Sequence, residues 1–102
     1  MTQETSSGES INAQRIVQMR AKLEAQFTPV EMELLDQSHL HAGHAGARSG
    51  KGHFDLMIVS EQFRDQNLIQ RHRAIYTALG DLMQTDIHAL SINAYTPDEA
   101  PS

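Results

Sequence analysis

The sequence predicts a two-layer α+β domain in which two helices pack on one small sheet. Two stretches repeat apolar residues at spacings of three and four, the period of an amphipathic helix. Three others alternate apolar and polar residues, the period of a half-buried strand. The expected order is helix, strand, strand, helix, strand. Two helices with apolar stripes and one sheet can bury those stripes together only as two layers.

The first helix is expected to follow an N-cap at Ser10. Its apolar face consists of Ile16, Met19, Leu23 and Phe27. Pro29 disfavours helix for the residue before it and therefore ends this element. Residues 30–37 then alternate and predict the first strand, which a long loop would connect to the second strand in an antiparallel hairpin.

The second strand is predicted over residues 54–60 and the third over residues 87–95. The helix between them is predicted to start at an Asp65 N-cap and to continue through Gly80, which weakens the pattern without ending it. Its apolar stripe comprises Leu68, His72, Ile75, Leu79 and Leu82, widened by Ile69, Tyr76 and Met83. In the third strand, one face is predicted to carry His88, Leu90, Ile92 and Ala94.

The 102 residues are expected to form one domain over 11–96, with tails at 1–10 and 97–102. No apolar run reaches the ~20 residues that a bilayer-spanning helix needs. The first residues lack the basic region and apolar core of a secretory signal, so we expect a cytoplasmic protein. The absence of cysteine excludes disulfides and sites held by the chain's own thiolates. The net charge of −5 opposes sequence-independent binding to a phosphate backbone.

The loop that starts at Ser38 is the first candidate site, because it holds His39, His41 and His44 within six residues. Neutral imidazole is a common metal ligand, although a solvated loop whose histidines bind nothing is an equal alternative. His88 is a further candidate ligand, and its alternative is a half-buried strand histidine packed beside Leu90. The three loop histidines could also form a mononuclear site among themselves, since catalytic zinc takes three protein ligands.

Two histidines without a thiolate fit half of a shared site. In some [2Fe–2S] centres, two His replace two Cys on one iron. A second protein or a small thiol would then have to supply the sulfur ligands.

Basic residues are concentrated between positions 48 and 73, where phosphate contact and simple solvation are the two alternatives. His72 belongs to the apolar stripe and is expected to be a packed, hydrogen-bonded structural residue. No Gly-rich phosphate loop with its lysine and no Ser/His/Asp ordering is present, so we do not expect an enzyme.

The motifs of the chain resemble those of the BolA family. They are the run from Asp36 to His44, then His53-Phe54, Val59-Ser60 and Phe63, then Arg71-His72-Arg73-Ala74-Ile75-Tyr76, and finally Ile87-His88-Ala89-Leu90-Ser91. The match covers about positions 11–97. It implies an αββαβ fold like the type II KH domain, with a three-stranded sheet covered by helices on one face.

The resemblance also implies a function. BolA-like proteins form heterodimers with monothiol glutaredoxins and share a [2Fe–2S] cluster. Mapped onto this chain, the ligands are His88 and His41, with His44 or His39 as the alternative to His41. Glutaredoxin and glutathione would supply the thiolates, so the chain is expected to be an adaptor in cluster trafficking or iron sensing, and a monomer or weak homodimer when free.

Some members of the family are transcription regulators that bind DNA around a Phe-x-Gly turn and the Arg-His-Arg helix. The corresponding contacts here are Arg64, Arg71, Arg73 and Lys51. This chain has Phe63-Arg64-Asp65 at the turn. The aspartate removes the easy left-handed turn that glycine provides and adds negative charge beside the surface proposed for DNA.

Overall fold

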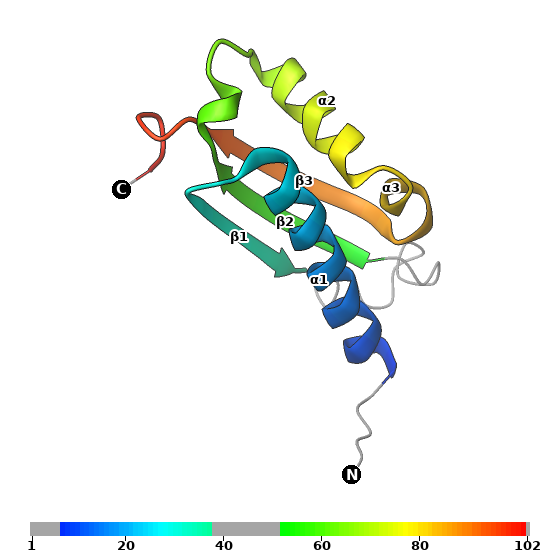
Figure 1. Cartoon of the computed structure of the whole chain (residues 1–102). Helices are drawn as coiled ribbons and strands as arrows, with labels where there is room; N and C mark the ends of the chain where they lie inside the picture. Colours follow the sequence, from blue (N-terminus) through cyan, green and yellow to red (C-terminus); the bar gives the residue numbers. More distant parts are fainter. Residues whose placement is uncertain (1–6, 38–51, 102) are drawn as a thin grey trace.

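The computed structural model of the chain describes residues 7–37 and 52–101 (Figure 1). Its elements are α1 (Ser7–Phe27), β1 (Glu31–Asp36), β2 (Gly52–Val59), the 3-10 turn η3 (Glu61–Phe63), α2 (Leu68–Leu79), α3 (Leu82–Thr85) and β3 (Ile87–Tyr95). The strands form one sheet in the order β1-β2-β3, and the helices lie on one of its faces. The predicted two-layer α+β fold is therefore confirmed.

The central strand, β2, pairs with its two neighbours in opposite senses. β1 and β2 form the predicted antiparallel pair, with Glu31 opposite Val59 and Asp36 opposite Phe54. β3 runs parallel to β2, which is possible because α2 and α3 carry the chain back to the start of the sheet. The parallel ladder shifts register once, between Gly52 and His53.

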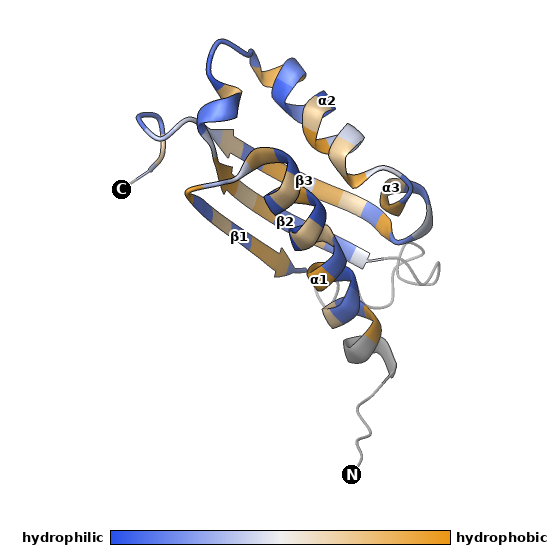
Figure 2. Ribbon diagram, in the orientation of Figure 1, coloured by the Kyte–Doolittle hydropathy of each residue, from blue (hydrophilic) through white to orange (hydrophobic). Residues whose placement is uncertain are grey.

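The core lies between the sheet and the helices. Alternate β2 residues Phe54, Leu56 and Ile58 are at most 2% exposed and form its centre. Figure 2 shows hydrophobic residues along the strands and hydrophilic residues around η3 and the segment between η3 and α2. The predicted face of α1 is confirmed: Met19, Leu23 and Phe27 are buried, and Ile16 is half-buried against the core. No helix among the described residues is long and apolar enough to span a membrane.

The ends of the helices differ from the prediction. α1 begins at Ser7, ahead of the expected cap at Ser10. The N-cap of α2 is Asn67, whose side chain and that of Gln70 form a capping box. Asp65 lies too far upstream to cap and instead adopts the left-handed conformation, with φ 68°. The turn expected to be lost with glycine is thus retained, since aspartate tolerates this region better than most residues.

Gly80 ends α2, in contrast to the uninterrupted helix that the sequence predicts. With φ 57°, it turns the chain, and its N–H donates to the carbonyl oxygen of Tyr76. The predicted apolar stripe is also too wide, because Leu68 and Ile69 are 64% and 63% exposed and Tyr76 is 41% exposed. The helix buries Ile75 and Leu79 only.

His72 is half-buried on α2, as the packed position predicts. Its Nε2 makes no hydrogen bond to any residue that the structure describes, so the expected hydrogen bond is not seen at this atom.

Candidate functional site

His88 occupies an irregularity at the beginning of β3. The register passes from Gly52 opposite Ile87 to His53 opposite Ala89, so His88 is skipped in the ladder. Such a β-bulge gives one strand an extra residue and re-aims its side chain. Ile87 is buried in the core, whereas His88 is exposed. The predicted shared face of His88 and Leu90 is therefore wrong, because the bulge separates them.

His53 lies directly beside His88. Their ring centroids are 4.8 Å apart and the rings are tilted by 49°. His53 is 8% exposed, so one imidazole of the pair is buried and the other is open to solvent. His53 was absent from the predicted site residues. The available signal was its place directly after the histidine loop, in the His53-Phe54 motif.

The residues that flank the histidine loop also lie at this end of the sheet. Before the loop, the Gln37 N–H donates to the carbonyl oxygen of His53 over 2.7 Å. After the loop, the Gly52 N–H donates to the carbonyl oxygen of Asp86 over 2.9 Å. The predicted ligands His39, His41 and His44, together with Lys51, lie outside the described residues. Both points of attachment of their loop nevertheless adjoin the pair of His53 and His88.

A polar network joins α1 to this end of the sheet. The Arg15 guanidinium donates to Asp86 Oδ2 over 3.0 Å and to Asn12 Oδ1 over 2.9 Å. Asn12 in turn donates to Asp36 Oδ2 over 3.1 Å at the end of β1. Hydrogen bonds from Thr85 and then Arg15 lower the pKa of Asp86. The network therefore fixes the segments before the loop and before His88 relative to α1.

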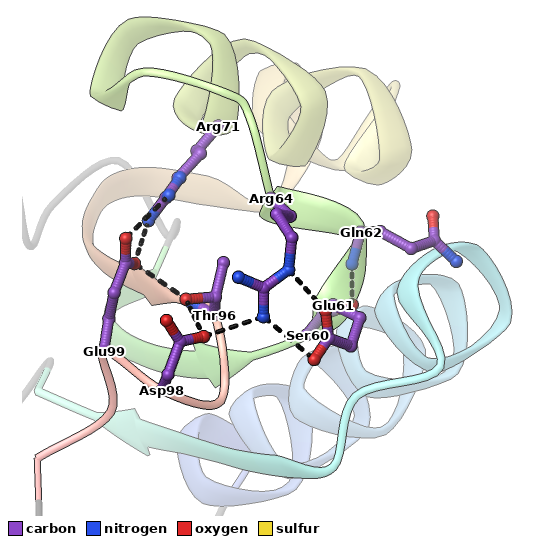
Figure 3. Close-up of polar contacts among 8 residues, drawn as sticks. All are labelled: Ser60, Glu61, Gln62, Arg64, Arg71, Thr96, Asp98 and Glu99. Atoms are coloured by element: carbon purple, nitrogen blue, oxygen red, sulfur yellow. Dashed lines mark hydrogen bonds and ion pairs between the residues drawn. The ribbon is translucent and has the colours of Figure 1, made fainter.

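Arg64, a predicted nucleic-acid contact, lies at the opposite end of β2 and is paired with two acids (Figure 3). Its Nε and Nη2 donate to the two carboxylate oxygens of Glu61 over 2.8 and 3.0 Å. Nη2 also donates to Asp98 Oδ1 over 2.7 Å. These bonds raise the pKa of Arg64 above its usual range. The positive charge of this guanidinium is thus already balanced by two carboxylates of the same chain.

Arg71 is held more firmly. Its Nε donates to the carbonyl oxygen of Gln66 over 2.9 Å, and its Nη1 donates to that of Ala94 over 3.0 Å. The outer edge of the guanidinium makes a bidentate pair with Glu99, over 2.6 and 3.2 Å (Figure 3). The Arg71 side chain is 11% exposed and that of Glu99 45%.

The carboxylates that pair with these arginines are also bonded to Thr96. Its N–H donates to Glu99 Oε1 and its Oγ1 to Asp98 Oδ1, each over 3.0 Å. Bonds from Arg71 and then from the Thr96 backbone lower the pKa of Glu99 to about 2. Arg64 is the main cause that lowers the pKa of Asp98 to about 2. Residues 96–101 therefore fold back onto both arginines.

Arg73 is exposed and makes no ion pair within the part of the chain that the structure describes. The structure thus separates the predicted nucleic-acid contacts. Arg64 and Arg71 are paired with acids, Arg73 is open to solvent, and Lys51 is outside the described residues.

Comparison with known proteins finds one family whose match includes both the histidine pair and the paired arginines. Residues 23–99 match the family described as BolA-like protein. The chain is 44% identical over 103 residues to SufE-like protein 1, chloroplastic/mitochondrial, of Arabidopsis thaliana, across 94% of this chain. It is 41% identical over 103 residues to protein BOLA1, chloroplastic, of the same plant, across 98% of this chain. It is 40% identical over 78 residues to the DNA-binding transcriptional regulator BolA of Escherichia coli K12, across 76% of this chain and 71% of that protein.

The likeness extends to the fold. The solved BolA domain of SufE1 from Arabidopsis thaliana matches with a TM-score of 0.76 and 41% identity, over 95% of this chain and 100% of that one. The chain spans 28% of the SufE-like relative and 64% of BOLA1, so it corresponds to one part of each.

Proposed function

The chain belongs to the BolA family, and on this basis we propose that it is an adaptor that pairs with a monothiol glutaredoxin and shares a [2Fe–2S] cluster with it, in cluster trafficking or iron sensing. The observation that supports this proposal is the position of His88. It is an exposed imidazole on a bulge, next to His53, where the loop with three further histidines is attached.

The chemistry of the available ligands fits a shared cluster. The chain has no cysteine, and its described residues contain no group of three His, Cys, Asp or Glu that could hold a metal. Two imidazoles can replace two thiolates on one iron of such a cluster. His88 would be one ligand and His41 the other, with His44 or His39 as the alternative. When bound, the cluster supplies a redox-active iron centre that absorbs visible light, while glutaredoxin and glutathione supply the thiolates.

The experiment is to mix the chain with a cluster-loaded monothiol glutaredoxin and to record visible absorption and circular dichroism. We expect a changed spectrum that is lost on His88→Ala and is kept on Ser91→Ala, an exposed position of the same strand. Separate His39→Ala, His41→Ala and His44→Ala variants would identify the loop ligand. A spectrum that does not change on mixing would contradict the proposal.

We also propose that the adaptor is not an enzyme and that it acts in the cytoplasm. The names of the three relatives describe a SufE-like protein, a BOLA protein and a transcriptional regulator, and none names an enzyme. The proposed location differs from that of two of the relatives, which are named as chloroplastic or mitochondrial. Fluorescence microscopy of the tagged chain in its source cell would test the location.

A second candidate function is DNA binding, because the Escherichia coli relative is named a DNA-binding transcriptional regulator. Among the predicted DNA contacts that the structure describes, Arg73 is exposed on α2 and makes no ion pair with another described residue. A gel-shift titration across salt concentrations tests this function. The slope of log affinity against log salt changes by about 0.9 for each phosphate contact, so Arg73→Ala should flatten it by about that amount. No detectable complex at low salt would eliminate this candidate.

A further inference from the structure

Arg71 has the geometry of an anion site that is already filled. Two backbone carbonyl oxygens, of Gln66 and Ala94, fix its guanidinium in place. The remaining edge points to a carboxylate, Glu99, which it binds through both Nη atoms. A third donor, the Thr96 N–H, reaches the same carboxylate. Planar bidentate guanidinium contacts suit phosphate as well as carboxylate.

We propose that residues 96–101 act as a built-in competitor, in which Glu99 and Asp98 occupy the position that a phosphate group would take at Arg71 and Arg64. We take the phosphate to come from a nucleic-acid backbone. Only this choice of phosphate source rests on the second candidate function. The inference is independent of the glutaredoxin partnership. The consequence is that Arg71 contacts phosphate only when this segment moves away.

The contacts of the segment suit displacement. The pair between Arg64 and Asp98 is exposed, with side chains 47% and 66% accessible, and salt screens such pairs. A tethered carboxylate still competes strongly, because a short tether gives it an effective concentration on the order of millimolar. A polyanion with several phosphates can outcompete this tethered carboxylate, whereas a single weak anion at low concentration cannot.

The two arginines would gain unequally from release. Without Glu99, Arg71 keeps both carbonyl contacts, so its outer edge stays oriented and becomes available. Without Asp98, Arg64 keeps both hydrogen bonds to Glu61. We therefore expect release to add one phosphate contact, at Arg71, and little at Arg64.

The test compares the full chain with the double variant Asp98→Asn/Glu99→Gln, using fluorescence anisotropy of a labelled DNA duplex of about 20 base pairs across salt concentrations. The matched control is Glu33→Gln/Asp81→Asn. It changes the net charge equally at two exposed positions that form no ion pair with any described residue. We expect the first variant to bind roughly tenfold more tightly, the size of one charge-assisted contact. Its salt slope should be steeper by about 0.9.

Addition of Arg71→Gln to the double variant should remove the gain. An equal gain in the control, or a gain that survives Arg71→Gln, would overturn the inference, because net charge alone would then explain it. Thermal melts of all variants verify that each is folded.

A second measurement separates this inference from the DNA-binding candidate. Inorganic phosphate is titrated into both proteins, and the NMR signal of the Arg71 Nε–H is followed. A shift in the double variant at lower phosphate concentration than in the unmodified chain supports the inference, even if neither protein binds DNA, in which case only the DNA candidate fails. Equal responses to phosphate together with equal DNA affinities overturn the inference.

Discussion

The imidazole rings of His53 and His88 lie 4.8 Å apart, one buried in the fold and the other open to solvent. The difference in burial predicts that substitution will cost little stability at His88 and more at His53. His88→Ala should change the free energy of unfolding by less than about 0.5 kcal/mol, because the side chain is exposed. His53→Ala should cost about 1–3 kcal/mol, because it removes a buried side chain.

Urea denaturation of the two variants checks this prediction. If His88→Ala unfolded as easily as His53→Ala, the open position of His88 would be wrong. His88→Ala would then no longer serve as a clean probe of cluster binding.

Asp65 adopts a left-handed conformation, which glycine accepts at lower cost. Asp65→Gly should therefore raise the free energy of unfolding by about 0.5–1 kcal/mol. The control is Asp81→Gly, since Asp81 has an ordinary helical φ of −61°. There, glycine should lower stability by about 0.5–1 kcal/mol through its greater freedom in the unfolded chain. Chemical denaturation measures both, and equal signs would contradict the prediction.

Gly52 has no room for a side chain. An added Cβ would lie 2.4 Å from two ring atoms of Phe54, which is buried in the core. Gly52→Ala should cost about 1–3 kcal/mol and should shift the amide signals of residues 87–89, which pair with this end of β2. Gly80→Ala is the comparison. Its added Cβ would lie 3.9 Å from the nearest neighbouring atom, so only the positive φ at this position opposes a side chain. Unchanged amide signals at 87–89 in the Gly52 variant would argue against this tight contact.

The acids that hold Arg64 and Arg71 predict a pH dependence of stability. In the folded chain, the pKa values of Asp98 and Glu99 are lowered to about 2, from ordinary values of 3.8 and 4.5. A lowered pKa stabilises the fold above the ordinary value, and this stabilisation is lost as the pH falls to the folded value. The stability difference between the unmodified chain and Asp98→Asn/Glu99→Gln should therefore shrink between pH 5 and pH 2.

Urea titrations at several pH values measure this difference. A constant difference across the range would show that the carboxylate charges do not stabilise the segment.

Periodicity was sufficient to predict the five main elements, because burial on one face imposes its own spacing on a helix or a strand. It failed at the helix ends. Asp65 and Asn67 are both acceptable caps by residue type, and only the path of the backbone decides between them. Gly80 likewise fits a helix or ends one, depending on its φ.

The candidate site was predictable in part. The histidine motifs pointed to one end of the domain, but the bulge that turns His88 outward leaves no mark in the alternation of residue types. The ion pairs of Arg64 and Arg71 were also not predicted, because their partners Asp98 and Glu99 lie far along the sequence in a segment expected to be a tail. Such pairing depends on the tertiary path of the chain, which residue spacing does not encode.

The parallel pairing of β2 with β3 has a kinetic consequence. Strands joined through a helical crossover make non-local contacts, and contacts of this kind form slowly because a long loop must close first. The two neighbouring imidazoles therefore come together only when that crossover has docked. A ligand that binds at this end of the sheet, as the proposed cluster would through His88, can recognise only chains that have completed folding, and by mass action it would hold them in that state.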